Sequence, residues 1–183
     1  MKKTTIIFIL AGITFLGSFG SAHSEVKAYL YLSGINGESK NPNYPNWIEL
    51  LTFSWQISNT STINGGGAGA GRSIVRPLIV KKLIDKSSAP LFLRVLIASH
   101  IYEGILALQQ QGGNPYEVLR IKMGDIIITN ITSDTNSGLS AEAVALDFGK
   151  FCYKYTPLKA DGSPDSPVEQ CFSIVTNQII SPF

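Results

Sequence analysis

A glycine-rich stretch is the part of this sequence whose spacing comes nearest to a known chemical motif. Gly66 to Ser73 reads G-x-x-x-x-G-R-S, which differs from the phosphate-binding P-loop in having Arg72 where that motif has lysine. A P-loop also needs a helix directly after its glycines, because the amide groups and dipole of that helix converge on the phosphate. Here the next residues are β-branched and include Pro77, which disfavours a helix. We therefore expect a glycine loop between strands and no phosphate site.

The two histidines offer no metal site. His23 lies near the amino terminus, and His100 has no second histidine or cysteine at ligand spacing. A hydrogen bond or dipole contact at a helix carboxyl end is the expected role of His100. We predict no metal and no cofactor.

The carboxylates are dispersed along the chain. Glu117 with Asp125, or Asp161 with Asp165, could pair, but the second pair lies in a turn-rich segment where aspartate is ordinary turn chemistry. A serine–histidine–aspartate triad can be scattered in sequence, yet no nucleophile-elbow pattern is present. We predict that the protein is not an enzyme; an exported enzyme with an inconspicuous site is the remaining alternative.

The first 24 residues have the layout of a secretory signal peptide. Lys2 and Lys3 precede an apolar stretch, and small residues at 22 and 24 suit cleavage before Glu25, with cleavage after Ala22 as an alternative. A membrane anchor is the competing interpretation, but the stretch is short for a span of about 20 residues. We expect residues 25–183 to form one exported domain, periplasmic or extracellular, with no stable membrane span.

Without Lys2 and Lys3, the remaining chain has 13 basic and 13 acidic side chains. A near-neutral chain of this kind creates no general attraction for nucleic acid or anionic lipid. We therefore expect no nucleic-acid partner.

The two cysteines, Cys152 and Cys171, are predicted to form a disulfide. An even number of cysteines behind an export signal favours a bridge, because the periplasm is oxidising. Both lie nearly equidistant from Asp161-Gly162, so a hairpin folded there brings them opposite each other. The sequence period does not say whether that site is hydrogen-bonded, and two unconnected buried thiols remain the alternative.

Short alternating segments separated by turn residues indicate a mainly β domain. Residues 26–33 alternate, with Leu30 and Leu32 on one face and Tyr29 and Tyr31 on the other. Further strands are predicted at 47–58, 72–84 (interrupted by Pro77), 101–111, 116–132 (kinked at Gly124), 139–156 and 168–176. The segments between them, 34–46, 59–71, 112–115 and 157–167, are rich in glycine, proline and asparagine and are predicted loops.

One helix is predicted, over residues 89–99. Ser87 and Ser88 can cap its amide groups, and Pro90 suits its first turn. It is apolar nearly all round apart from Arg94, so we expect it to be covered on more than one side.

Taken in order, these segments resemble the haemolysin-coregulated protein (Hcp) family, the tube protein of bacterial type VI secretion. The resemblance covers most of residues 25–183, and each piece alone is a weak signal. It is carried by residues 29–32 (YLYL), 34–39 (GINGES), 47–55 (WIELLTFSW), the glycine loop and basic strand, 84–88 (IDKSS), 111–113 (QGG), 119–123 (LRIKM), 125–128 (DIII), 144–148 (VALDF) and 155–162 (YTPLKADG).

The resemblance implies an Hcp-like β-barrel of two antiparallel sheets with one flanking α-helix. It also implies a homo-hexameric ring, rings that stack into a tube, contact with the secretion spike, and a lumen that holds effector proteins. By the same analogy Ser54 would face the lumen. The loop at 59–71 would reach the neighbouring ring, through Gly65, Gly66, Gly67, Gly69 and Gly71.

The export signal departs from the family pattern, since tube-building members assemble in the cytoplasm. It supports a second interpretation, in which the chain is a secreted Hcp-like carrier or binding ring that acts outside the secretion machine.

Overall fold

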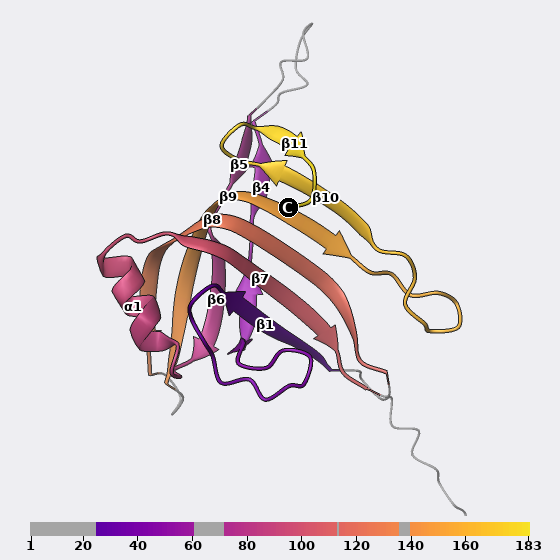
Figure 1. Ribbon diagram of the computed structural model, residues 1–183, viewed down its shortest axis with the longest axis horizontal. Coiled ribbons are helices and arrows are strands. Elements are labelled where there is room, and N and C mark those ends of the chain that lie inside the picture. Colours follow the sequence, from indigo (N-terminus) through magenta and orange to yellow (C-terminus); the bar gives the residue numbers. More distant parts are fainter. Residues whose placement is uncertain (1–24, 61–71, 113, 136–139) are drawn as a thin grey trace, which may run out of the picture.

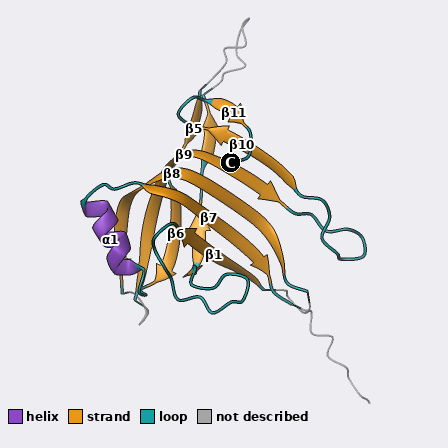
Figure 2. Ribbon diagram, in the orientation of Figure 1, coloured by secondary structure: helices purple, strands orange, loops and turns teal. Residues whose placement is uncertain are grey.

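Antiparallel strands make up most of the computed structural model of this chain (Figures 1 and 2). The structure describes residues 25–60, 72–112, 114–135 and 140–183. The elements are β1 (Val26–Leu32), β2 (Ile48–Leu50), β3 (Thr52–Ser54), β4 (Ile57–Asn59), β5 (Ser73–Val75), β6 (Leu78–Leu83), α1 (Ser88–Leu96), β7 (Ile101–Gln110), β8 (Tyr116–Asp134), β9 (Ala141–Tyr155), β10 (Val168–Ser173) and β11 (Gln178–Ile180). The predicted mainly β fold with one flanking helix is confirmed.

The strands close into a barrel. β1 pairs with β2 on one side and β7 on the other, and the ladder continues through β8 and β9 to β6. β6 pairs with β3, and only Leu51 separates β3 from β2, so the circuit returns to its start. The second, smaller sheet is the pair β4–β5. Closure satisfies strand edges that would otherwise be open to pairing.

The outer edge of β9 is shared between two strands. Its first half pairs with β6, up to Leu146, and its second half, from Lys150, pairs with β10. β10 and β11 therefore extend the sheet beyond the barrel, as Figure 1 shows at the upper right. We call residues 168–183 the arm.

Strand alternation places the core. Leu78 and Val80 of β6 and Ile121 and Met123 of β8 are fully buried, whereas Ile79 between the first two is 42% exposed. Burial of each such side chain contributes about 1.5–3 kcal/mol. At one end of the barrel this core continues into packed aromatic rings, namely Trp55, Phe148, Phe151 and Phe172.

Two predicted strands have different limits in the structure. The predicted strand at 47–58 is three short strands, because the chain leaves β1 at Leu51 to pair with β6 and breaks again at Trp55. The predicted strand at 168–176 ends at Ser173; the chain then turns through Asn177, whose φ is 55°, into β11, which sequence patterning missed.

The kink expected at Gly124 lies one residue later. Asp125 has a φ of 57° and drops out of the pairing with β9, yet β8 continues as one strand to Asp134. Residues other than glycine rarely adopt a positive φ, and aspartate is among those that tolerate it.

The helix is covered less than predicted. Within α1, Leu91 is buried against the core, whereas Phe92, Leu93 and Leu96 are each more than half exposed. The expectation of cover on more than one side is therefore wrong for the described chain, because α1 packs by one side on β8. The serine cap is also wrong, since Ser87 makes no side-chain bond to the helix amides.

Among the described residues, no helix is both long and apolar enough to cross a membrane.

Candidate functional site

A buried lysine anchors the start of α1. Lys82 occupies the third core-facing position of β6, after Leu78 and Val80, and its side chain is 1% exposed. Its Nζ lies 2.7 Å from Asp85 Oδ1 and 2.7 Å from Glu142 Oε1 on β9. It also donates to the backbone oxygen of Leu83 at 2.9 Å. The ammonium is thus fully partnered, as a buried charge must be.

Ser88 connects this cluster to the helix. Its hydroxyl donates to Glu142 Oε1 at 2.8 Å and accepts from Lys82 Nζ and from the Asp85 amide, both at 3.1 Å. Ser87 Oγ donates to Asp85 Oδ1. Ser88, which was predicted to cap the helix, instead ties its first turn to β6 and β9, whereas Ser87 bonds to the loop before the helix.

The loop between β1 and β2 is also linked to the helix start. Gly37 lies so close to the backbone oxygen of Trp47 that a Cβ would collide with it, which explains a glycine at this position. The next residue, Glu38, accepts a hydrogen bond from the Lys86 amide at 3.0 Å. Residues 37–39 (GES) thereby fix the loop to the segment that leads into α1.

An aromatic cluster covers the outer face of β1 and β7. Tyr29 and Tyr44 stack with ring centroids 4.6 Å apart, and Trp47 meets Tyr44 edge-on at 5.0 Å. The Tyr44 hydroxyl donates to Glu117 Oε2 at 3.0 Å, and Arg120 grips the same carboxylate with two hydrogen bonds, at 2.7 and 2.8 Å. Burial, reinforced by the negative charge of Glu117, raises the pKa of the Tyr44 phenol. The hydrogen bond to Glu117 raises the pKa of Arg120.

Among the described residues, large apolar side chains are exposed in several regions, including two that lie at different ends of the molecule. The first, which we call the helix patch, consists of Phe92, Leu93, Leu96 and Ile97, which are 54–67% exposed. The second is an apolar cleft of about 280 Å³ between the β4–β5 hairpin and the arm. Its apolar walls include Ile57, Val75, Phe151, Tyr153, Phe172 and Ile179. Figure 1 shows α1 and the β4–β5 hairpin at different ends of the molecule.

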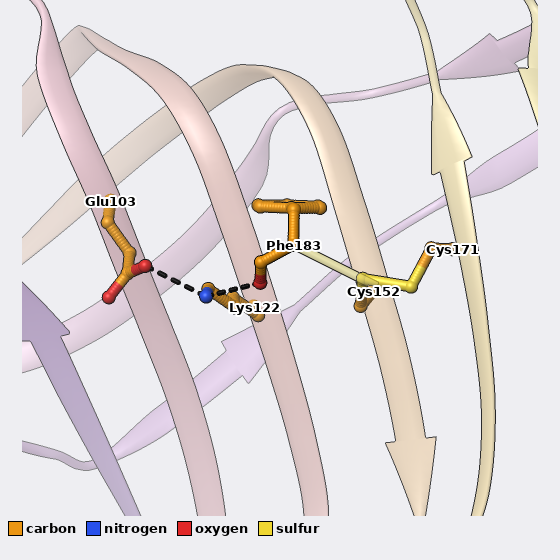
Figure 3. The surroundings of a disulfide bond; sticks show 5 residues. All are labelled: Glu103, Lys122, Cys152, Cys171 and Phe183. Carbon is orange, nitrogen blue, oxygen red and sulfur yellow. Dashed lines mark hydrogen bonds and ion pairs between the residues drawn. A yellow bond between two sulfur atoms is a disulfide. The ribbon is translucent and has the colours of Figure 1, made fainter. Parts of the chain in front are cut away.

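Cys152 and Cys171 form the predicted disulfide (Figure 3). They are direct cross-strand partners on β9 and β10, with Cα atoms 4.0 Å apart. A carboxylate oxygen of Glu169 lies within 4.8 Å of both sulfurs, but sulfurs joined to each other offer no thiolate for a metal.

Comparison with known proteins decides the family. The family model described as "Type VI secretion system effector, Hcp" matches residues 29–155. The chain belongs to the Hcp family. Protein hcp1 of Pseudomonas aeruginosa is 31% identical, and the match covers 83% of this chain and 97% of that protein.

Solved structures agree with this Hcp assignment. The crystal structure of Hcp1 from Salmonella typhimurium has a TM-score of 0.71 at 26% identity, covering 85% of this chain and 99% of that one. Another, described as the structure of a type six secretion system protein, has a TM-score of 0.80 at 20% identity and covers 85% and 100% of the two chains. At that identity the second likeness shows the fold alone.

The residues predicted for the Hcp tube have different outcomes. Ser54 is exposed on β3, opposite Ile79 of β6, and its role at a lumen stays a prediction. Gly65, Gly66, Gly67, Gly69 and Gly71 lie outside the described residues. The segments that flank them pair as β4 and β5, so the residues after the glycines form a strand and not the helix that a P-loop needs.

The remaining candidate residues are engaged individually. Glu117 is held by Arg120 and Tyr44, while Asp125 lies further along β8, 3.9 Å from Lys150. Asp161 accepts from the amide and hydroxyl of Ser163, which lowers its pKa. His100 is exposed, and its backbone oxygen, at 3.4 Å, accepts from Arg94.

Sequence reasoning missed the buried Lys82 cluster and the partly buried contact of Tyr44 with Glu117 and Arg120. Strict alternation along β6 places Lys82 on the core side with Leu78 and Val80, so its burial was readable from the period. The contact of Tyr44 with Glu117 joins residues 73 positions apart, and no local pattern predicts it.

Proposed function

We propose that this Hcp-family chain is a structural, ring-forming component of a type VI secretion tube, with hexameric rings that stack. The helix patch is the observation that carries the proposal, because four large apolar side chains on one helix face are an unusual exposed surface for a monomer. The apolar cleft beside the arm lies elsewhere on the barrel. Two different apolar surfaces suit a head-to-tail contact, which closes into a ring when the rotation between copies allows it.

The remaining parts of the chain have roles within this proposal. The loop that contains Gly65 to Gly71 contacts the neighbouring ring, and Ser54 faces a lumen that holds effector proteins. The secretion spike is the expected partner at the end of the tube. Catalysis has no part in this function.

We propose further that residues 1–24 are a signal peptide and that the mature protein is periplasmic or extracellular. The Cys152–Cys171 disulfide supports export, because such bonds form and persist in oxidising compartments. The same bond favours a second candidate function, a secreted Hcp-like carrier ring that works outside the machine.

The shape of the protein in solution tests the ring. We expect the chain starting at Glu25 to elute as a hexamer and to appear as rings by negative-stain electron microscopy. A protein that stays monomeric at high concentration would refute both candidate functions.

Secretion separates the two candidates. Amino-terminal sequencing of the secreted protein is expected to start at Glu25 or His23, a result that would contradict assembly of the tube in the cytoplasm. Secretion that stops when the type VI machine is inactivated supports the tube, whereas secretion that continues unchanged supports the carrier ring.

A further inference from the structure

The last three described residues fold back across the sheet. Residues 181–183, which we call the strap, leave β11 and end at β8, where Lys122 Nζ donates to the backbone oxygen of Phe183 (Figure 3). The Phe183 ring lies 5.2 Å from Lys122 Nζ and 4.6 Å from Lys150 Nζ. Glu103 holds the same Lys122 ammonium at 2.9 Å. The strap is thus fastened by a charge-assisted hydrogen bond and by cation–π contacts.

A glycine makes room for the strap. A Cβ on Gly124 would lie 2.6 Å from Lys150 Cε and 3.1 Å from Phe183 Cε2. A larger residue at position 124 would displace the Lys150 side chain and crowd the Phe183 ring. The glycine of β8 therefore leaves the space that the Phe183 ring occupies.

The disulfide lies in the path of the strap. Lys122, Cys152, Cys171 and Ile180 are successive cross-strand partners on β8, β9, β10 and β11, so their side chains share one face. Three strand spacings amount to about 14 Å, whereas three residues extend about 10 Å. The strap follows Ile180, beside Cys171, and ends within reach of Lys122, so its course from β11 to β8 crosses β10 and β9 near the two cysteines.

The burial of the cysteines agrees with this course. Cys152 is 1% exposed and Cys171 is 4% exposed, although the Lys150 side chain on the same face of β9 is 36% exposed. A face that lies outside the barrel core is expected to leave a disulfide open to solvent unless something covers it.

We propose that the strap is a cover over the Cys152–Cys171 disulfide and controls the rate at which a dithiol reductant opens it. In that reaction a thiolate of the dithiol attacks one sulfur, the S–S bond breaks, and the other cysteine leaves as a thiolate that takes a proton. The second thiol of the reductant then attacks the mixed disulfide. This frees the first cysteine as a thiol and leaves the reductant as a disulfide. The first attack needs an open approach along the S–S axis, and the strap blocks it.

Protection of the disulfide would keep the arm attached to the barrel. The arm is joined to the barrel through the half of β9 from Lys150 to Tyr155, and the disulfide is its covalent attachment there. A covered disulfide that forms in an oxidising compartment survives later contact with reducing thiols. The arm, which forms one wall of the apolar cleft, then stays in place.

The rate of disulfide reduction tests the proposal. The oxidised full chain and its variants are treated with dithiothreitol under native conditions, quenched with an alkylating agent at intervals, and weighed by mass spectrometry. Lys122→Met and Phe183→Ala are expected to be reduced about tenfold faster than the wild type, the size expected for loss of one charge-assisted hydrogen bond. The matched control is Lys154→Met, two residues from Cys152 on β9, which is expected to stay within about twofold of wild type.

Loss of the lysine charge by itself would slow the reduction rather than accelerate it. The attacking thiolate is an anion, so removing a lysine lowers its local concentration and slows the reaction. Acceleration in Lys122→Met but not in Lys154→Met therefore reports access to the sulfurs.

Low urea concentrations separate strap opening from unfolding of the whole protein. Reduction through strap opening depends weakly on urea, because little surface is exposed, whereas reduction through global unfolding rises steeply. Wild-type rates in both strap variants would overturn the proposal. So would an acceleration that follows global unfolding, or one shared equally by Lys154→Met.

Discussion

At the scale of single residues, the contact of Tyr44 with Glu117 and Arg120 links a loop to the barrel wall. Tyr44 belongs to the loop between β1 and β2, whereas both charged partners stand on β8. Because the Arg120 guanidinium neutralises Glu117, the phenol can donate to a carboxylate without leaving a charge unpaired. The hydrogen bond therefore fixes the loop at a cost in desolvation that the ion pair offsets.

The raised pKa of Tyr44 gives this contact a pH dependence. The unfolded phenol ionises near its ordinary value of 10.0, whereas the folded one stays neutral to higher pH. Its stabilising effect is therefore complete below about pH 10 and declines as the pH rises above that value. We expect Tyr44→Phe to lower the free energy of unfolding by about 1.5–3 kcal/mol at pH 7 and by progressively less above pH 10.

Urea unfolding from pH 7 to 11 measures this difference. Tyr102→Phe is the control, because Tyr102 is 81% exposed. A gap between wild type and Tyr44→Phe that stays constant up to pH 11 would contradict the assignment.

The burial of Lys82 could be predicted from the sequence, but its partners could not. Its position in the alternation of β6 places it inside, yet Glu142 comes from β9, 60 positions further along the chain. Sequence period reports which face a side chain occupies, whereas pairing between distant strands decides what it meets there.

The Lys82 cluster should be costly to break from one side. Lys82→Met leaves the carboxylates of Asp85 and Glu142 without their cation, and we expect it to lower the free energy of unfolding by about 3–5 kcal/mol. Lys81→Met, at the neighbouring exposed position of β6, is expected to stay within about 0.5 kcal/mol of wild type.

A double variant gives this prediction its internal check. Adding Glu142→Gln to Lys82→Met removes one of the two unpaired carboxylate charges, so the double variant should recover part of the lost free energy of unfolding. Equal stability of the Lys82→Met and Lys81→Met proteins in urea unfolding would show that the cluster contributes nothing.

At the scale of elements, strands that keep one partner along a whole edge were predictable, whereas the segment that passes from one partner to another was not. β1 and β7 pair with each other along the whole of β1, and the predicted segments match them within one residue. The predicted strand at 47–58 changes partner from β1 to β6, and the chain breaks where it does so. A change of partner is a property of the barrel, so a local pattern does not contain it.

The arm illustrates how an element outside the closed barrel is secured. β10 reaches only the second half of β9, and β11 has three residues. The disulfide closes a loop with a sequence separation of 19, which in the chain-entropy account contributes about 3 kcal/mol. The hairpin symmetry about Asp161-Gly162 predicted this bond, because β9 and β10 pair with the register that this symmetry requires, which places Cys152 opposite Cys171.

At the scale of the whole molecule, the closed barrel restricts how copies can meet. Most strand edges of the barrel are satisfied within the chain, so contact between copies at the barrel wall has to use side chains and loops rather than strand addition. Resemblance to the family gave the fold and the role, but the exposure of the helix patch contradicts the cover expected from the apolar helix sequence. A helix that is apolar nearly all round and packed on one side is explained when a second copy covers the other.

Substitutions in the helix patch should therefore separate assembly from folding. Phe92→Ser and Leu96→Ser exchange side chains that are 59% and 67% exposed, so each should change the free energy of unfolding of the monomer by no more than about 0.5 kcal/mol. Loss of a large apolar anchor at a contact between copies costs about 2 kcal/mol or more, and a closed ring repeats that loss at every contact. We expect both variants to shift the protein from rings to monomers in sedimentation velocity at micromolar concentration.

Leu158→Ser, in the loop between β9 and β10 and 47% exposed, is the control that should leave assembly unchanged. Intact rings in both helix variants would place the contact elsewhere and would remove the observation on which the ring proposal depends.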